Sequence, residues 1–115
     1  MIPLLPEVEA FLARPQGLRV GGAEVASGEA LTVTDPSSER PLATVAAAGA
    51  REVDLAVRAA RDAFDGPWGR MAPAERGRLL WRLAEMVDAR ADVFGQLDTL
   101  DTGKPFARAR DVDAI

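Results

Sequence analysis

Residues 42–66 read LATVAAAGAREVDLAVRAARDAFDG, and the change of pattern within this stretch decides the fold. From Leu42 to Val45 apolar and polar side chains alternate, which is typical of a β-strand. After Gly49 the apolar period lengthens to about 3.6 residues, which predicts an amphipathic helix. Its apolar face is formed by Val53, Val57, Ala60 and Phe64. We expect this helix to end at Gly66–Pro67, where glycine can adopt the left-handed conformation and proline cannot continue a helix.

The residues before this stretch predict a short helix and two β-hairpins. Helical spacing over Pro6–Leu12 indicates one or two turns of helix, which we expect to lie as a flap on the surface. The segment Leu18–Val25 alternates on both sides of Gly21–Gly22, the pattern of a tight hairpin. Leu31–Thr34 is a second β-type run, and the turn residues Asp35–Ser38 join it to the strand at position 42. The first half of the chain is therefore expected to be rich in β-structure.

The residues after this stretch predict three more helices. One begins at Pro73, which suits the first turn of a helix, and its apolar stripe consists of Leu79, Leu80, Leu83, Met86 and Val87. We expect a break near Arg90 and a helix from Asp92, as its cap, to about Thr102, which Gly103 closes. Phe106–Ile115 resembles the start of a fourth helix without a stop signal, which predicts that the chain continues.

Composition excludes several kinds of chemistry. The 115 residues are 48% hydrophobic, a globular share that predicts one unit with a modest core burying roughly two thirds of the unfolded surface. Because the chain contains no cysteine and no histidine, it cannot supply a disulfide, a thiol nucleophile, an imidazole base or the usual zinc ligands.

Charge and hydropathy limit the expected partners. The formal net charge is −4 and Lys104 is the only lysine, so we expect no nucleic-acid partner, which would require a clustered basic face. No stretch is long and apolar enough to cross a bilayer, and no basic segment precedes an apolar run at the N-terminus. We therefore expect no membrane partner and a cytoplasmic location.

Two carboxylates and two glycine-containing segments are the candidate motifs. Asp98 and Asp101 are spaced i, i+3 and share a helix face, which could hold a hard cation, although spacing alone favours a solvated face. Gly21–Gly22 lacks the spacing of a dinucleotide loop, and Gly103–Lys104 lacks that of a phosphate loop. The residues alone therefore predict a soluble α+β segment without a complete catalytic constellation.

Arginines and tryptophans of the second half are expected to have structural roles. Arg76, Arg78 and Arg82 indicate a polar helix face that pairs with Glu75 and Glu85. Trp68 and Trp81 are expected to be packing residues, with use at an interface as the less favoured alternative.

Several strings resemble the N-terminal region of the NAD(P)-dependent aldehyde dehydrogenase superfamily. Residues 97–105, LDTLDTGKP, are similar to the family's E-T-L-D-T-G-K-P, and residues 73–80, PAERGRLL, are similar to its P-A-E-R-x-x-x-L. Residues 59–68, AARDAFDGPW, resemble its A-A-R-x-A-F…W segment. Residues 35–39, DPSSE, resemble N-P-A-T-G-E but depart from it at Asp35 and Glu39. These matches indicate the superfamily and no particular subfamily.

The resemblance implies an α+β segment of an α/β enzyme, with N-terminal β-hairpins followed by amphipathic helices. Residues 1–115 would be the N-terminal fragment of the cofactor-binding, Rossmann-like domain, which this chain leaves incomplete. The implied enzyme oxidises a small aldehyde to a carboxylic acid with NAD or NADP and forms a homodimer or tetramer. Its catalytic cysteine and glutamate would lie beyond this segment, so no catalytic or cofactor-binding residue is expected here. Arylacetaldehydes and betaine aldehyde both remain candidate substrates.

The resemblance also implies a structural Na⁺ or K⁺ ion. Its ligands would be the backbone carbonyls of Val33 and Thr34 and the side chain of Asp101, with a fourth protein ligand from beyond Ile115. Hard oxygen ligands suit these ions. Asp98 would remain a surface acid.

Two functional hypotheses follow from these observations. The first is a fragment of an aldehyde-oxidising enzyme, inactive alone, that exposes the apolar faces of Leu79–Val87 and Phe94–Leu100 and aggregates. The second is a free-standing interaction module derived from the same family, for which we expect a cooperative melt.

Overall fold

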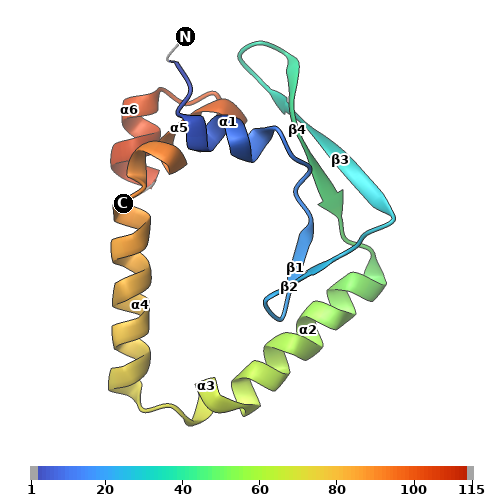
Figure 1. Ribbon diagram of the computed structural model, residues 1–115, viewed down its shortest axis with the longest axis vertical. Coiled ribbons are helices and arrows are strands. Elements are labelled where there is room, and N and C mark those ends of the chain that lie inside the picture. Colours follow the sequence, from blue (N-terminus) through green and yellow to red (C-terminus); the bar gives the residue numbers. More distant parts are fainter. Residues whose placement is uncertain (1–2, 114–115) are drawn as a thin grey trace.

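The computed structural model describes residues 3–113, and its first half contains a short helix and two β-hairpins (Figure 1). The elements are α1 (Pro6–Leu12), β1 (Leu18–Val20), β2 (Ala23–Val25), β3 (Glu29–Asp35) and β4 (Arg40–Ala47). β1 pairs antiparallel with β2, and β3 pairs antiparallel with β4, as two separate two-stranded sheets. Both predicted hairpins are therefore confirmed.

The second half is helical. The elements are α2 (Ala50–Asp65), α3 (Pro67–Arg70), α4 (Pro73–Asp88), α5 (Ala91–Thr102), α6 (Phe106–Arg108) and the π-helix η1 (Ala109–Asp113). Hairpins followed by amphipathic helices are the predicted α+β arrangement, which is confirmed. The elements follow one another around an open ring, with α2 and α4 on opposite sides and α1 beside α5 (Figure 1).

The first hairpin shows why its sequence folds locally. Gly21 and Gly22 have φ angles of 59° and 84°, values that residues with a Cβ rarely adopt. Positive φ at both central positions gives the turn a twist that matches the flanking strands. Leu18 consequently lies opposite Val25 in the ladder.

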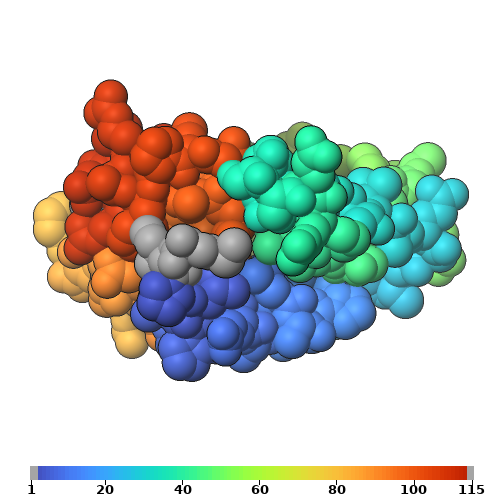
Figure 2. Space-filling model, turned by 90° about the horizontal axis from the view of Figure 1, so that it is seen from above, coloured from blue at the N-terminus to red at the C-terminus, as the bar shows by residue number. Residues whose placement is uncertain are grey.

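The two ends of the ring meet in a cluster that we call the clasp, formed by α1, α5 and η1. α1 lies at the surface with five of its seven residues exposed, and it is anchored by Val8, which is fully buried. Ala91 and Ala109 are also buried here, and the side chain of Gln96 holds the backbone of residues 3–5. Figure 2 shows the blue N-terminal segment lying beside the orange and red C-terminal elements. The clasp is thus the part of the described chain that has interior packing.

The opposite side of the ring, formed by α2, α3 and α4, is called the arm. None of its described residues is buried. Trp68 is 40% exposed and Trp81 is 72% exposed, so the prediction that they are packing residues is wrong. They are exposed because no residue of α3 or α4 is buried by the other elements of residues 3–113.

Several expected details of the helices are corrected. α2 ends where predicted, but Gly66 has φ −88°, so no left-handed residue terminates it. α5 begins at Ala91 without a side-chain cap, and Asp92 instead forms an ion pair with Arg110. Within residues 3–113 the predicted ion pairs of Arg76, Arg78 and Arg82 with Glu75 and Glu85 do not form. The Arg76 guanidinium donates to the backbone carbonyl of Met71, and Glu85 accepts a hydrogen bond from Trp81 Nε1.

The segment after Lys104 is a short α-helix continued by a π-helix, where one regular helix was expected. Val112 at its end is 58% exposed, and Ile115, expected on the same apolar side, lies outside the described residues. No helix within residues 3–113 combines the length and hydropathy needed to cross a membrane.

The surface area shows how open the chain is. Its accessible surface is 8576 Å², whereas a compact monomer of 12.2 kDa exposes about 6,000 Å². Its radius of gyration is 16.9 Å, compared with about 13 Å for a compact domain of this length. A core of the expected size is therefore absent: the interior of the described residues is limited to the clasp, where Val8 is the one large side chain that is fully buried.

Candidate cation site

The hairpin of β3 and β4 contributes an irregular backbone segment to the candidate site. Val33 pairs with Ala43 and Thr34 pairs with Pro41, so the register shifts between Val33 and Thr34. A bulge disrupts the ladder locally and leaves backbone groups without their regular partners. Val33 and Thr34, whose carbonyls the family resemblance implies as ligands, therefore lie on either side of the register shift between β3 and β4.

The turn after β3 is held by Asp35. Its carboxylate accepts a hydrogen bond from Ser38 Oγ at 2.7 Å and one from the Ser37 backbone N–H at 2.8 Å. These two bonds, the Ser38 hydroxyl first, lower the pKa of Asp35 below its ordinary value, because both favour the ionised form. The turn is thus fixed by an ionised carboxylate.

The C-terminal end of α5 packs against this turn. Gly103 ends the helix with φ 76°, and its N–H donates to the Thr99 carbonyl. A Cβ atom at Gly103 would lie 3.2 Å from Pro36 Cγ, so the helix end and the turn are in close contact. The two strings DPSSE and LDTLDTGKP, far apart in sequence, are therefore neighbours in space.

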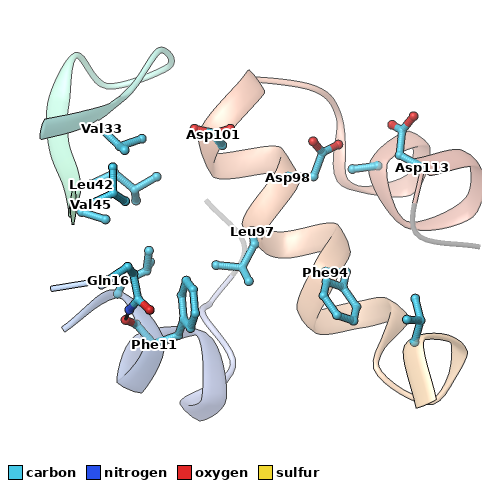
Figure 3. Close-up of a pocket in the computed structure, with 14 residues that line it drawn as sticks. Phe11, Gln16, Val33, Leu42, Val45, Phe94, Leu97, Asp98, Asp101 and Asp113 are labelled. Atoms are coloured by element: carbon cyan, nitrogen blue, oxygen red, sulfur yellow. Dashed lines mark hydrogen bonds between the residues drawn. The ribbon is translucent and has the colours of Figure 1, made fainter. Parts of the chain in front are cut away.

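A pocket of about 520 Å³ lies beside this junction (Figure 3). Val33 of β3 and Asp98 and Asp101 of α5 line it, together with Asp113 of η1. The remainder of its lining is largely apolar and comes from α1, β4, α4 and α5. The structure therefore brings Val33 and Asp101 to one pocket, whereas Thr34 is not among its lining residues.

Asp98 is not the surface acid that was expected. It is half-buried, and its Oδ2 atom is buried without a hydrogen-bond partner among the described residues. Lys104 Nζ lies 3.9 Å from this oxygen and 2.7 Å from Asp113 Oδ2. The hydrogen bond to Asp113 is the main reason that the pKa of Lys104 is raised. The only lysine of the chain therefore connects α5 with η1 beside the pocket.

Two carboxylates at this pocket are hard oxygen donors. Asp101 is exposed at the end of α5 and lines the pocket together with the half-buried Asp98. Within residues 3–113, no three His, Cys, Asp or Glu side chains are grouped closely enough to hold a metal ion. An ion here would therefore need backbone carbonyls, as weakly charged sites for Na⁺ or K⁺ do.

Sequence reasoning missed two residues that shape this region. Gln96 Oε1 accepts from the Leu5 N–H at 2.9 Å, and its Nε2 donates to the Pro3 carbonyl at 3.1 Å. The available signal was a polar residue within the apolar run Val93–Leu97. Asp113 offered no local signal, because its partner Lys104 lies across a change of helix type.

Known proteins resemble this chain along most of its length. A family model described as "Aldehyde dehydrogenase family" matches residues 23–114. An aldehyde dehydrogenase of Alternaria alternata is 38% identical over 102 residues, which are 87% of this chain and 20% of that protein. The 2-hydroxymuconic semialdehyde dehydrogenase of Pseudomonas sp. (strain CF600) is 44% identical over 109 residues, which are 95% of this chain and 21% of that protein.

Solved structures agree with these sequences. The NAD⁺ complex of aldehyde dehydrogenase from Bacillus cereus superposes with a TM-score of 0.95 at 39% identity, over 98% of this chain and 24% of that one. The chain belongs to the aldehyde dehydrogenase family. It spans about a fifth of the length of the curated relatives that it matches.

Proposed function

We propose that residues 1–115 are the N-terminal fragment of the cofactor-binding domain of an enzyme that oxidises an aldehyde to a carboxylic acid with NAD⁺ or NADP⁺, and that they are not catalytic alone. The agreement with the Bacillus cereus enzyme over 98% of the chain carries this proposal. The nicotinamide coenzyme, bound elsewhere in the complete enzyme, accepts the hydride. The chain itself has no cysteine to attack the aldehyde.

In this enzyme we expect the segment to have a structural role, and the first part of that role is to bind a cation. We place Na⁺ or K⁺ between the carbonyls of Val33 and Thr34 and the carboxylate of Asp101. The register shift at Val33 and Thr34 and the shared pocket of Val33 and Asp101 support this placement. An ion at this position would link the hairpin of β3 and β4 to the end of α5, and it would so hold the clasp against this hairpin.

The remaining parts of the proposal rest on the family resemblance. They are a small-molecule aldehyde as substrate, with the arylacetaldehyde and betaine aldehyde types among the candidates, a homodimeric or tetrameric enzyme, and a cytoplasmic location. The free-standing module is the less favoured function, because 8576 Å² of exposed surface is more than a self-contained domain of this mass presents.

A chimera tests the proposed function directly. Residues 1–115 replace the matched quarter of the Bacillus cereus enzyme, and the rate of NADH formation from an aldehyde is followed at 340 nm. We expect activity within about tenfold of the parent enzyme, since a tenfold change corresponds to only 1.4 kcal/mol in the activation free energy. A folded, oligomeric chimera without any NADH formation would contradict the proposal.

The cation site is tested in the same chimera. Binding at ten times Kd should stabilise the protein by about 1.4 kcal/mol, so Tm should rise in NaCl or KCl relative to choline chloride. Asp101→Ala should abolish this difference. Asp62→Ala, which removes an exposed carboxylate on α2, is the matched control and should leave it unchanged. An equal salt response in both variants would exclude Asp101 as a ligand.

A further inference from the structure

Within residues 3–113 the arm presents two exposed apolar stripes, of which the one on α2 borders β1. We define them as Val53, Val57 and Phe64 on α2 and Leu79, Leu80, Leu83 and Met86 on α4. Each of these side chains is between 48% and 64% exposed, although their spacing is that of helix faces which pack in folded proteins. Apolar stripes of this size on a monomer mark a surface that another polypeptide covers.

The amount of surplus surface indicates the size of that polypeptide. The chain exposes about 2,500 Å² more than a compact monomer of its mass. A standard interface between independent proteins buries only about 800 Å² on each partner, and larger, more apolar interfaces are typical of obligate assemblies. A small ligand or a transient partner would therefore leave most of the surplus uncovered.

The occupant can be identified from the length of the relatives. The same conformation, with a TM-score of 0.95, occurs in a Bacillus cereus chain of which this segment covers 24%. The same open arrangement therefore occurs in a protein of whose chain about three quarters is not matched by this segment. We propose that the arm stripes dock the remaining portion of an aldehyde dehydrogenase chain, and that they do so even when this portion is a separate polypeptide.

This inference rests on the proposed function and adds to it that covalent continuity is not required. The clasp supports the addition, because α1, α5 and η1 are packed with one another inside the 115 residues. The fragment therefore has one region that is ordered by its own contacts and one that is left open for a partner. Assembly in trans then requires only that the second polypeptide cover the arm.

The experiment co-expresses residues 1–115, carrying an affinity tag, with the Bacillus cereus enzyme from which the matched quarter has been deleted. We expect the two polypeptides to co-purify and to form NADH from NAD⁺ and an aldehyde. The double variant Leu80→Ser, Leu83→Ser on the α4 stripe should lower the recovered complex about 100-fold. Arg78→Ser with Glu85→Ser, on the opposite side of α4, is the matched control and should recover the complex unchanged, since both double variants leave the net charge unaltered.

The outcomes separate this inference from the proposed function. A covalent chimera that is active, together with no complex in trans, overturns the inference and leaves the function intact. A complex in trans without activity in either arrangement supports docking and overturns the function. If the fragment instead forms a stable dimer that the stripe variant dissociates, the occupant is a second copy and the inference is wrong. Far-UV circular dichroism of the isolated fragment verifies that α4 forms in both double variants.

Discussion

The clasp and the arm are built from the same kinds of residues but differ in what covers them. α5 carries three buried residues, Ala91, Gly95 and Gln96, whereas α4, a longer amphipathic helix, carries none. The difference lies in the neighbours, since α5 contacts α1, α6, η1 and β3, and α4 has few contacts beyond the start of α5. Amphipathic sequence creates an apolar face, but a second element must supply the interior.

The largest expected effect is a difference in amide hydrogen exchange between the two regions. In the isolated 115-residue chain, amides of α5 should exchange about 100-fold more slowly than those of α2 and α4, because local opening of the arm breaks few buried contacts. Exchange followed by mass spectrometry resolves the helices separately. Equal protection of α4 and α5 would remove the distinction between clasp and arm.

A second prediction concerns the side chain that crosses the clasp. Gln96→Leu removes both hydrogen bonds to the backbone of residues 3–5 and leaves the partly buried Leu5 N–H without its partner. We expect α1 to lose about 1–3 kcal/mol of protection, the usual cost of an unsatisfied buried group. Exchange rates of amides in Pro6–Leu12 measure this loss.

Gln16 provides the control for that experiment. Its Nε2 donates to the Phe11 and Arg14 carbonyls, which are exposed. Gln16→Leu should change the protection of α1 by less than about 0.5 kcal/mol, because water replaces these bonds. If the two glutamine variants behaved alike, Gln96 would not be the residue that connects α1 with α5.

A third prediction compares a glycine in each region. A Cβ at Gly95 would lie 2.9 Å from Arg110 Cβ and 3.0 Å from its Cα, so Gly95→Ala should push η1 away from α5. The expected net loss in the clasp is about 1–2 kcal/mol, since overpacking outweighs the gain in helix propensity. Local exchange of α5 amides gives this value.

The matched change in the arm should have the opposite sign. Nothing lies within 4 Å of a Cβ at Gly77. Gly77→Ala should therefore stabilise α4 by about 0.5–1 kcal/mol through backbone entropy alone. A destabilised α4 in this variant would show that the arm is covered where we describe it as open.

The smallest expected effect is the pH dependence of the hairpin turn. Because the folded pKa of Asp35 lies below its ordinary value of 3.8, its contribution to stability is complete above that value and is lost as the pH falls through the folded pKa. The chemical shift of the Ser37 amide should report this acid transition. Asp35→Asn should abolish it, and a transition that persisted in this variant would belong to another carboxylate.

The elements that were predicted correctly are those with local signals. Gly21–Gly22, Pro73 and Gly103 act within a few residues of the chain, so the first hairpin, the start of α4 and the end of α5 follow from the sequence. The short helix α3 and the π-helix η1 have no such signal and were not predicted. The exposure of Trp81 does not, because helical spacing reveals an apolar face without revealing whether this chain covers it. The openness of the arm could therefore not be predicted from the sequence.

The candidate site was predictable to a similar extent. The family resemblance selected Val33, Thr34 and Asp101, and the structure brings Val33 and Asp101 to one pocket. The half-burial of Asp98 was not predictable, since it depends on Lys104 and on a π-helix that no periodicity indicates. The presence of an ion and the ligand set of Val33, Thr34 and Asp101 stay predictions.

The bond between Gln96 and the backbone at Leu5 joins positions 91 residues apart, and this separation has a consequence for the order of folding. The hairpins and helices form from neighbouring residues. Closing so long a loop costs more chain entropy, which the contacts of the clasp must offset. During synthesis α1 therefore cannot pack against α5 until α5 has left the ribosome.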